Sequence, residues 1–449
     1  MFIQRITNLF SSISLYLEKS SERKKILKNL TWLLSERGLK VIAELGVGTW
    51  MARYLGPQNF GVYNYSLAII SLFSAFTNLG LSGIVVRDLV RNQQRELEIL
   101  GSTLFLKIVA GLIGTLAILI FASVANFQTV VVKLALSILS LSLTFQAFDT
   151  IDLYFQSKIR SKYTVIIKVI IIAVSSIVKI ALIALNASVL AFAAIASGEF
   201  AFTALGLALI YQANEKQLFQ WKFNLKTAKS LLSQSWPLII SQMGVVIYFK
   251  VDQIMIQNFL NLESVGIYSA AVRLSESCYF LPGLVMASLF PSILQSKHIS
   301  ESAYIQNFQK SYNLMAAIAY AIIILGIFSS NILVSLLYGE DYQEAGLILS
   351  IHLTSSLFIF LGAVLSKWLI SEELIFFSLT RHGAGACMNL LLNLFFIPAY
   401  GILGAAIATV LSYGVATYGA CFLDSRTRIA GTMMTQAIFM PLYWLKKNQ

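Results

Sequence analysis

Charged residues are scarce in this sequence. Only 12% of its 449 residues are Asp, Glu, Lys or Arg, whereas 57% belong to the hydrophobic set. An ordinary soluble domain has about 25% charged and about 45–50% apolar residues. A water-soluble protein of this length could not cover its surface with so few charges, so the composition excludes a soluble enzyme. It also excludes a single-span receptor with a large soluble domain.

Cysteine and histidine are rare too. The three cysteines, Cys278, Cys387 and Cys421, lie far apart, and the three histidines are dispersed. We expect neither a disulfide framework nor a metal site, because neither set has the spacing that such sites need. No P-loop motif is present, which disfavours transport driven by ATP bound to this chain. We therefore expect no cofactor.

Long polar segments are missing between the apolar runs, which excludes a large extracellular or nucleotide-binding domain. We expect no enzyme activity. A membrane-embedded glycan polymerase or ligase is only a minor alternative, because such an enzyme should show a sizeable outer loop with catalytic groups. The basic residues follow the loops rather than one patch, so no nucleic-acid partner is expected.

The sequence is rich in apolar runs of about 20 residues, the length of a helix that crosses a bilayer. Polar, proline or glycine breaks separate these runs. We therefore predict an all-α polytopic membrane protein with about twelve transmembrane helices. The predicted spans are 31–54, 60–81, 97–122, 130–148, 163–185, 189–211, 236–259, 266–288, 308–334, 346–365, 375–397 and 401–423.

The basic residues predict the orientation of these spans. If the N-terminus is cytoplasmic, 22 of the 33 Lys and Arg residues lie in cytoplasmic segments and nine lie within spans, whereas only Arg53 and Lys133 lie on the extracellular side, at the outer ends of their spans. Cytoplasmic loops carry the excess of Lys and Arg in membrane proteins. We predict a multi-pass protein of the cell (inner, cytoplasmic) membrane with both termini in the cytoplasm.

The longest connection, residues 212–235, is polar and basic and divides the spans into two six-helix bundles, 31–211 and 236–423. We expect this linker to be cytoplasmic. The flanking segments, 1–30 and 424–449, are also predicted to be cytoplasmic. The first has apolar residues at helical spacing, which indicates an interfacial helix. We expect the apolar stretch 429–445 to be interfacial rather than spanning.

Internal similarity supports the division into two related halves. Gly61 and Tyr63 recur 205 residues later as Gly266 and Tyr268, each at the first outer turn of its half. The run 193–196 (AAIA) recurs as 405–408 at an offset of 212, in the last span of each half. Repeats of this kind are common in membrane transporters.

Nine basic residues fall within the predicted spans, against five carboxylates when Glu98, at the edge of the third span, is left out. An ionised side chain at mid-bilayer costs about 2.5–3.5 kcal/mol unless it faces protein or water. The excess of four positive charges therefore predicts an aqueous interior cavity that favours anions. The basic residues are Arg37, Lys40, Lys107, Lys168, Lys179, Lys250, Arg273, Lys310 and Arg381, and the carboxylates are Glu36, Glu44, Glu199, Asp252 and Glu276.

These basic residues differ in their predicted depth in the membrane. Lys168, Lys179 and Lys310 lie nearer to helix ends, from which long side chains reach the interface. Lys40, Lys107, Lys250 and Arg273 lie near mid-span.

The alternative to a cavity is internal ion pairing. Residues three or four apart share a helix face, and this spacing joins Glu36 to Lys40, Lys40 to Glu44, and Arg273 to Glu276. Lys107 and Arg381 have no carboxylate at that spacing. Pro282 lies inside the eighth predicted span, where proline kinks a helix. It is a hinge candidate, although a static kink is the alternative.

Four segments have a recognisable pattern: KVDQIMIQNFLNLESVGIYSAAVRL (250–274), RYLGPQNFGVYNYSLA (53–68), LYGEDYQEAG (337–346) and AYGILGAAIATVLSYG (399–414). They resemble the polysaccharide-biosynthesis (O-antigen repeat-unit) flippases of the multidrug, oligosaccharidyl-lipid and polysaccharide exporter superfamily. The resemblance implies two six-helix bundles in a V shape around a cavity that opens alternately to each side. It also implies transfer of an anionic lipid-diphosphate-linked oligosaccharide from the inner to the outer leaflet.

The resemblance also implies roles for the charged residues. The diphosphate or acidic sugars would bind Arg37, Lys40, Lys107, Lys250, Arg273 and Arg381, with Lys168 and Lys179 as weaker candidates. Coupling to H+ or Na+, or pairing, would fall to Glu44, Glu199, Asp252 and Glu276. The expected partners are membrane lipids, the lipid-linked oligosaccharide and polysaccharide assembly proteins.

Two other classes of protein in the same superfamily fit the sequence less well. A multidrug or small-molecule antiporter remains the alternative function, but a pump for cationic drugs needs more acidic residues than the spans supply. The peptidoglycan-precursor flippases are expected to have fourteen spans, whereas twelve are predicted here.

Overall fold

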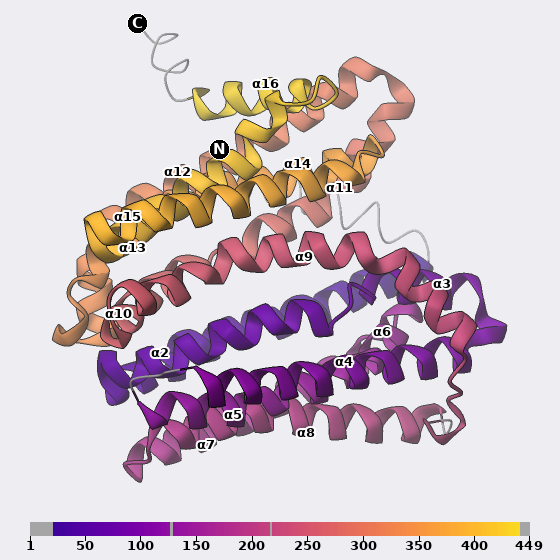
Figure 1. Cartoon of the computed structure of the whole chain (residues 1–449). Helices are drawn as coiled ribbons and strands as arrows, with labels where there is room; N and C mark the ends of the chain where they lie inside the picture. The colour runs from indigo at the N-terminus through magenta and orange to yellow at the C-terminus, as the bar shows by residue number, and fades with distance from the viewer. Residues whose placement is uncertain (1–20, 126–128, 216–217, 441–449) are drawn as a thin grey trace, which may run out of the picture.

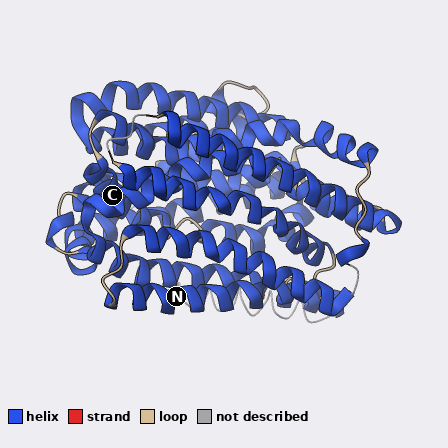
Figure 2. Ribbon diagram, turned by 60° about the horizontal axis from the view of Figure 1, so that its bottom comes forward, coloured by secondary structure: helices blue, strands red, loops and turns tan. Residues whose placement is uncertain are grey.

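Helices make up almost the whole described chain. The computed structural model describes residues 21–125, 129–215 and 218–440, and these residues form helices and loops without a strand (Figure 2). The α-helices are α2 (Ser21–Thr77), α3 (Ser82–Arg91), α4 (Glu96–Val124), α5 (Val130–Phe145), α6 (Asp149–Ser157), α7 (Lys162–Ala184), α8 (Val189–Glu215), α9 (Leu225–Phe259), α10 (Leu262–Glu276), α11 (Leu281–Ile299), α12 (Glu301–Tyr338), α13 (Ala345–Leu353), α14 (Ser355–Ser371), α15 (Ile375–Thr417) and α16 (Arg428–Ile438). Short 3-10 helices are η1 (Gln93–Arg95), η2 (Gln146–Phe148), η3 (Leu218–Gln220), η4 (Glu340–Tyr342) and η5 (Gly419–Phe422).

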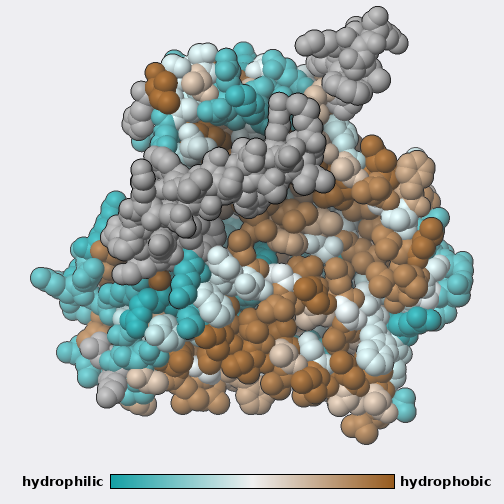
Figure 3. All heavy atoms as spheres, turned by 180° about the vertical axis from the view of Figure 1, so that it is seen from behind, coloured by the Kyte–Doolittle hydropathy of each residue, from teal (hydrophilic) through white to brown (hydrophobic). Residues whose placement is uncertain are grey.

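The helices are long and apolar enough for a membrane. Within the described residues, 10 helical stretches meet that standard of length and composition. On the face shown in Figure 3, hydrophobic residues gather in a broad central band and hydrophilic residues gather toward the ends of the helices. The prediction of an all-α polytopic membrane protein is confirmed. The count differs from twelve because two pairs of predicted spans each fall within one continuous stretch.

The first of these stretches folds back at Gly56 of α2. Gly56 has φ 69° and ψ 167°, a left-handed conformation that glycine adopts without a Cβ clash. Arg37 and Ser71 of α2 line the same cavity of about 810 Å³. In a straight helix these residues would lie about 50 Å apart. The two arms of α2 on either side of Gly56 are therefore neighbours.

The second stretch folds back at Gly401 of α15, where φ is 62° and ψ is −143°. The Tyr248 hydroxyl lies 3.0 Å from Nδ1 of His382, and the Tyr248 ring lies 5.2 Å from the ring of Tyr413. His382 and Tyr413 precede and follow Gly401, and a straight helix would separate them by about 45 Å. The two arms of α15 thus pack on the same part of α9.

The helices form two groups, which Figure 1 shows as stacked layers. Helices α2–α8 pack mainly on one another, and α9–α16 do so too, except for α10, which packs mainly on α2. Helix α2 also contacts α9, so it joins the two groups. The largest buried hydrophobic cluster draws residues from both groups, including Phe60, Ile256, Tyr268 and Ala405. These residues lie toward one end of the molecule, which also holds Gly56 and is called here the Gly56 end.

Two smaller hydrophobic clusters lie toward the opposite end. One contains residues of α3, α4, α6 and α8, such as Leu89 and Tyr211, together with Leu231 near the start of α9. The other contains residues of α11, α12, α14 and α16, such as Phe308 and Met434. The two groups therefore share the large core at the Gly56 end. At the other end, the start of α9 joins the core of the first group, whereas the second group also has a cluster of its own.

The predicted eighth span, 266–288, is broken. Helix α10 ends at Glu276 and α11 begins at Leu281, so Pro282 lies in the first turn of α11 rather than inside a continuous helix. Proline is tolerated there because the first N–H groups of a helix have no intrahelical partner. A proline-induced kink inside one helix is therefore wrong, whereas a hinge at this break stays a prediction.

The structure describes the predicted interfacial segments at the two ends of the chain only in part. Most of the predicted interfacial segment at the N-terminus, residues 1–20, lies outside the described residues. In the predicted interfacial tail, α16 has 11 residues, fewer than the roughly 20 needed to cross a bilayer. It buries Met433, Met434 and Ala437 in the same cluster as α12 and α14 residues.

Candidate functional site

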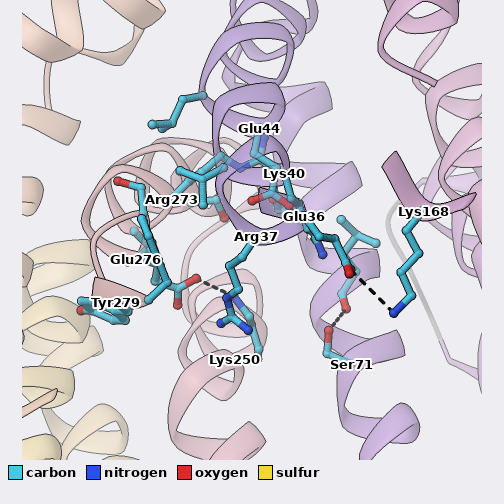
Figure 4. Close-up of a pocket in the computed structure, with 18 of the residues that line it drawn as sticks. Glu36, Arg37, Lys40, Glu44, Ser71, Lys168, Lys250, Arg273, Glu276 and Tyr279 are labelled. Atoms are coloured by element: carbon cyan, nitrogen blue, oxygen red, sulfur yellow. Dashed lines mark hydrogen bonds and ion pairs between the residues drawn. The ribbon is translucent and has the colours of Figure 1, made fainter. Parts of the chain in front are cut away.

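A cavity of about 810 Å³ lies between the two helix groups. It is lined by both arms of α2, by α6 and α7, and from the second group by α9, α10 and the turn after α10. Figure 4 shows charged side chains from these elements converging on one space. We call it the charged cavity, because its lining includes Glu36, Arg37, Lys40, Glu44, Asp152, Lys168, Lys250, Arg273 and Glu276.

The three lysines of the charged cavity form ion pairs. Lys168 Nζ lies 2.8 Å from Asp152 Oδ2 and 3.7 Å from Glu36 Oε1. Lys250 Nζ lies 3.3 Å from Glu276 Oε2. Lys40 and Glu44, one helical turn apart, are 3.9 Å apart and largely exposed. Of the predicted pairs, only Lys40 with Glu44 is formed; Glu36 and Glu276 pair with other lysines.

The two arginines of the charged cavity differ from its lysines. Among the described residues, neither Arg37 nor Arg273 has a carboxylate within ion-pair distance. The Arg273 guanidinium lies 5.2 Å from the centre of the Phe60 ring, a cation–π contact that fixes the group without neutralising it. An arginine offers five N–H donors in a planar fork that matches a phosphate or carboxylate. The cavity thus presents two arginines with unused capacity for an anion.

The net positive charge of the charged cavity is smaller than the sequence predicted. Five basic and four acidic side chains line it, an excess of one positive charge. The predicted excess of four counted only carboxylates within spans. Asp149 and Asp152 follow the predicted fourth span, yet they pair with interior lysines. Including them lowers the interior excess to two.

Three other predicted cavity residues lie elsewhere. Lys107 of α4 is 1% exposed and its Nζ lies 2.6 Å from Asp149 Oδ1. Lys179 Nζ lies 2.6 Å from Glu199 Oε1, and Ser175 also donates to that oxygen. Neither lysine lines the charged cavity.

Arg381 of α15 is also outside the charged cavity. It is 5% exposed, and its guanidinium donates to Ser366 Oγ at 3.1 Å. The structure therefore groups Arg37, Lys40, Lys168, Lys250 and Arg273, and it separates Lys107, Lys179 and Arg381 from them.

The predicted coupling carboxylates are divided in the same way. Glu44 and Glu276 line the charged cavity, whereas Glu199 and Asp252 do not. Asp252 is buried in the second group, where it accepts hydrogen bonds from Tyr268, from Thr409 at 3.1 Å and from the Gln253 backbone at 2.9 Å. These contacts join α9 to α10 and to the second arm of α15.

Sequence reasoning missed Asp149 and Asp152. They lie three residues apart at the start of α6, so they share a helix face. That spacing in the stretch FDTIDLYF was the available signal, but the position just after a predicted span suggested a cytoplasmic loop. Among the described residues, no group of three His, Cys, Asp or Glu side chains could hold a metal ion.

Sequence comparisons show which proteins this chain resembles. It is 25% identical over 405 residues to a putative O-antigen transporter of Shigella flexneri, covering 85% of this chain and 94% of that protein. It is 26% identical over 383 residues to the probable low-salt glycan biosynthesis flippase Agl15 of Haloferax volcanii, covering 83% and 78% respectively. Both relatives are named as transport proteins rather than enzymes.

Solved structures share the fold. The lipid II flippase MurJ in an inward closed conformation superposes with a TM-score of 0.67 at 15% identity, covering 94% of this chain and 93% of that one. An inward-facing multidrug resistance MATE family transporter of the MOP superfamily superposes with a TM-score of 0.63 at 18% identity, covering 87% and 94%.

A family model also matches the chain. The model described as "Polysaccharide biosynthesis protein" matches residues 26–297, which include all helices that line the charged cavity. The resemblance inferred from the sequence motifs is confirmed, and the chain belongs to this family of polysaccharide biosynthesis proteins.

Proposed function

We propose that the protein is a flippase that moves an anionic lipid-diphosphate-linked oligosaccharide repeat unit from the inner to the outer leaflet by alternating access. The cargo would be used for surface polysaccharide assembly. The similarity to an O-antigen transporter and to a glycan biosynthesis flippase supports the class of cargo.

The observation that carries the proposal is the pair of arginines in the charged cavity. Arg37 comes from the first helix group and Arg273 from the second, and both line one space without a carboxylate partner among the described residues. A diphosphate is an anion with several acceptor oxygens, and guanidinium groups bind such oxygens in pairs. One diphosphate held by both arginines would connect the two groups.

The distribution of buried cores supports alternating access. The groups share a core at the Gly56 end, and the charged cavity begins at the edge of that core, where Leu67 and Val272 line it. The basic residues predict that the Gly56 end is the outer end. On that orientation the molecule is closed to the outside and its cavity faces the cytoplasm, ready to accept cargo from the inner leaflet.

The two chain reversals support the finer architecture. We propose that α2 and α15 each cross the membrane twice, reversing at Gly56 and Gly401. Twelve crossings would then form two six-helix bundles, 31–211 and 236–423, joined by the cytoplasmic linker 212–235. Coupling to H+ or Na+ and contacts with polysaccharide assembly proteins stay predictions.

The test is delivery of a lipid-linked glycan to the outer leaflet in cells that lack their own flippase for it. A sugar-specific lectin added outside reports the glycan delivered. We expect Arg37→Ala and Arg273→Ala each to lower the delivery rate by about 10- to 100-fold, because a hydrogen bond to a charged group contributes about 1.5–3 kcal/mol.

Arg91→Ala serves as the matched control, because Arg91 is exposed on α3 and does not line the charged cavity. It should deliver glycan at the rate of the unmodified chain. If both cavity variants, present in the membrane at equal amounts, also deliver at that rate, the two arginines do not bind the cargo and the proposal fails.

A further inference from the structure

A second cavity adjoins the charged one. Its volume is about 550 Å³, within the range of about 300–1,000 Å³ typical of small-molecule sites. It is lined by the second arm of α2, by α5, η2 and α8, and from the other group by α9. Leu67 and Ser71 line both cavities. Figure 4 shows Ser71 on the wall of the charged cavity.

The chemistry of the second cavity is different. Nine charged side chains line the first, but the described lining of the second contains no Asp, Glu, Lys, Arg or His. Its polar side chains are all hydroxyls and carboxamides: Ser71, Ser74, Asn78, Ser142, Gln146 and Gln242. We call this cavity the neutral groove.

The carboxamides of the neutral groove have free hydrogen-bonding capacity. Ser74 donates to Gln146 Oε1 at 2.6 Å, and Asn78 donates to Ser74 Oγ at 3.2 Å. This arrangement leaves the Gln146 amide NH2 as a donor and the Asn78 carbonyl as an acceptor. Gln242, contributed by α9, is exposed and makes no side-chain hydrogen bond within the described part of the chain. Donors and acceptors are therefore both offered.

The remaining wall is apolar. Phe200 of α8 is 42% exposed and lies among aliphatic residues that include Val245 and Val246. A sugar ring has hydroxyls at its edge and apolar C–H faces, so it needs carboxamides and a flat apolar surface together. A hydrocarbon chain would instead leave buried amides without partners, at about 1–3 kcal/mol for each group.

We propose that the neutral groove binds uncharged sugar residues of the lipid-linked glycan while Arg37 and Arg273 hold its diphosphate. This inference rests on the proposed flippase function. The first sugar of such a cargo is bonded directly to the phosphate, so the two sites must adjoin, as they do at Leu67 and Ser71. The neutral groove thereby favours a cargo whose first sugars are neutral over one whose first sugars are acidic.

The test compares two probes on the purified full-length chain: a polyprenyl diphosphate bearing a neutral oligosaccharide, and the same polyprenyl diphosphate without sugar. Native mass spectrometry or a fluorescence titration gives the dissociation constant of each. We expect the sugar-bearing probe to bind at least 10-fold more tightly. Gln242→Met and Gln146→Met should each lower that preference by about 3- to 10-fold, because one neutral hydrogen bond contributes about 0.5–1.5 kcal/mol.

Two variants serve as controls. Asn214→Leu removes an exposed carboxamide from α8 outside the neutral groove and should keep the preference. Gln242→Met disturbs no hydrogen bond among the described residues, so it remains interpretable if Gln146→Met weakens the fold. Arg273→Ala should weaken both probes equally, since they share the diphosphate.

Each outcome decides between the sites. Equal binding of both probes to the unmodified chain would overturn the sugar site. So would tighter binding of the sugar-free probe to Gln242→Met, which would place the hydrocarbon tail in the neutral groove. If Arg273→Ala leaves both probes unaffected while the Gln variants still lose the preference, the diphosphate site fails and the sugar site stands.

Discussion

Gly61 of α2 and Gly266 of α10 pack against each other at the Gly56 end of the molecule. A Cβ on Gly61 would overlap the backbone oxygen of Leu262, and a Cβ on Gly266 would overlap that of Pro57. The two glycines lie 205 residues apart and occupy equivalent positions in the repeat predicted from the sequence. Their close contact is therefore formed by the same residue from each half, and it closes the end at which the two groups share a core.

Substituting either glycine should prevent this closure. In Gly61→Ala or Gly266→Ala the added methyl group meets backbone, which cannot rotate away, and overpacking of this kind costs about 1–3 kcal/mol. We expect the population of molecules open at the Gly56 end to rise. The measurement is the labelling rate of Ser71→Cys by a membrane-impermeant thiol reagent added from outside, in a chain whose three native cysteines are replaced by alanine.

Gly46→Ala is the control for this experiment, because no atom lies within 4 Å of a Cβ built at Gly46. It should label as slowly as the parent chain. Unchanged labelling in both Gly61→Ala and Gly266→Ala would show that the glycine contact does not control access to the cavity.

Replacing Lys107 should lower the stability of the fold rather than the delivery of the cargo. Its ammonium is buried and bonded to Asp149, so Lys107→Ala leaves that carboxylate without its partner. Breaking a fully buried pair costs about 3–5 kcal/mol. Because the Asp149 side chain is 40% exposed, we expect a smaller loss, on the order of 2 kcal/mol. Thermal unfolding in detergent measures the loss.

The double variant Lys107→Met with Asp149→Leu should recover much of that stability, because it removes both charges together. Glycan delivery per folded molecule should stay normal in both variants. A Lys107→Ala protein that unfolds like the parent chain but fails to deliver glycan would assign Lys107 to the cargo instead.

The stabilising ion pair of Glu276 should be the one with Lys250 rather than one with Arg273. The structure pairs Glu276 with Lys250 across α10 and α9 at 3.3 Å, although Arg273 lies one helical turn away. We expect the exchange Lys250→Glu with Glu276→Lys to unfold at a higher temperature than either single variant. Residues in contact show coupling energies of about 0.5–3 kcal/mol.

The comparison is the exchange Arg273→Glu with Glu276→Arg. We expect this double variant not to unfold at a higher temperature than its two single variants. Recovery in this second exchange alone would mean that the helix-turn pair predicted from sequence spacing is the one formed.

Asp252 should act as a structural junction. In Asp252→Ala the Tyr268 and Thr409 hydroxyls would lose their shared acceptor, and an unsatisfied buried polar group costs about 1–3 kcal/mol. We expect a clear drop in unfolding temperature for Asp252→Ala and a smaller drop for Asp252→Asn, which keeps a carbonyl acceptor. If Asp252→Asn unfolds like the parent chain but its transport no longer responds to a H+ or Na+ gradient, the residue couples an ion instead.

The membrane fold could be predicted from the sequence because hydrophobic runs, basic loops and turn motifs are local signals. Partners inside the membrane could not be predicted in the same way. Lys168 was assigned by its depth in the predicted span, yet its main partner, Asp152, comes from another helix, 16 residues away. The spacing rule finds pairs within one helix. It is silent on pairs that form only when two helices pack.

The same limit explains the grouping of the cavity residues. Arg37 and Arg273 are brought together by packing of α2 against α10, which no local pattern encodes. The repeat of Gly61 in Gly266 predicted two related halves but not this contact. The structure forms the contact where the two small residues allow the helix backbones to approach closely.

The ion pairs of the charged cavity bear on how the cargo leaves. A transport site must bind well enough to load and weakly enough to unload. With four carboxylates beside five basic groups, the wall contains its own competitors for every lysine. If the cargo carries a diphosphate, as proposed, we expect Lys168 to return to Asp152 and Glu36, and Lys250 to Glu276, when the phosphate departs. We therefore expect these carboxylates, which reduce the attraction of the cavity for an anion, to make release of the proposed cargo faster.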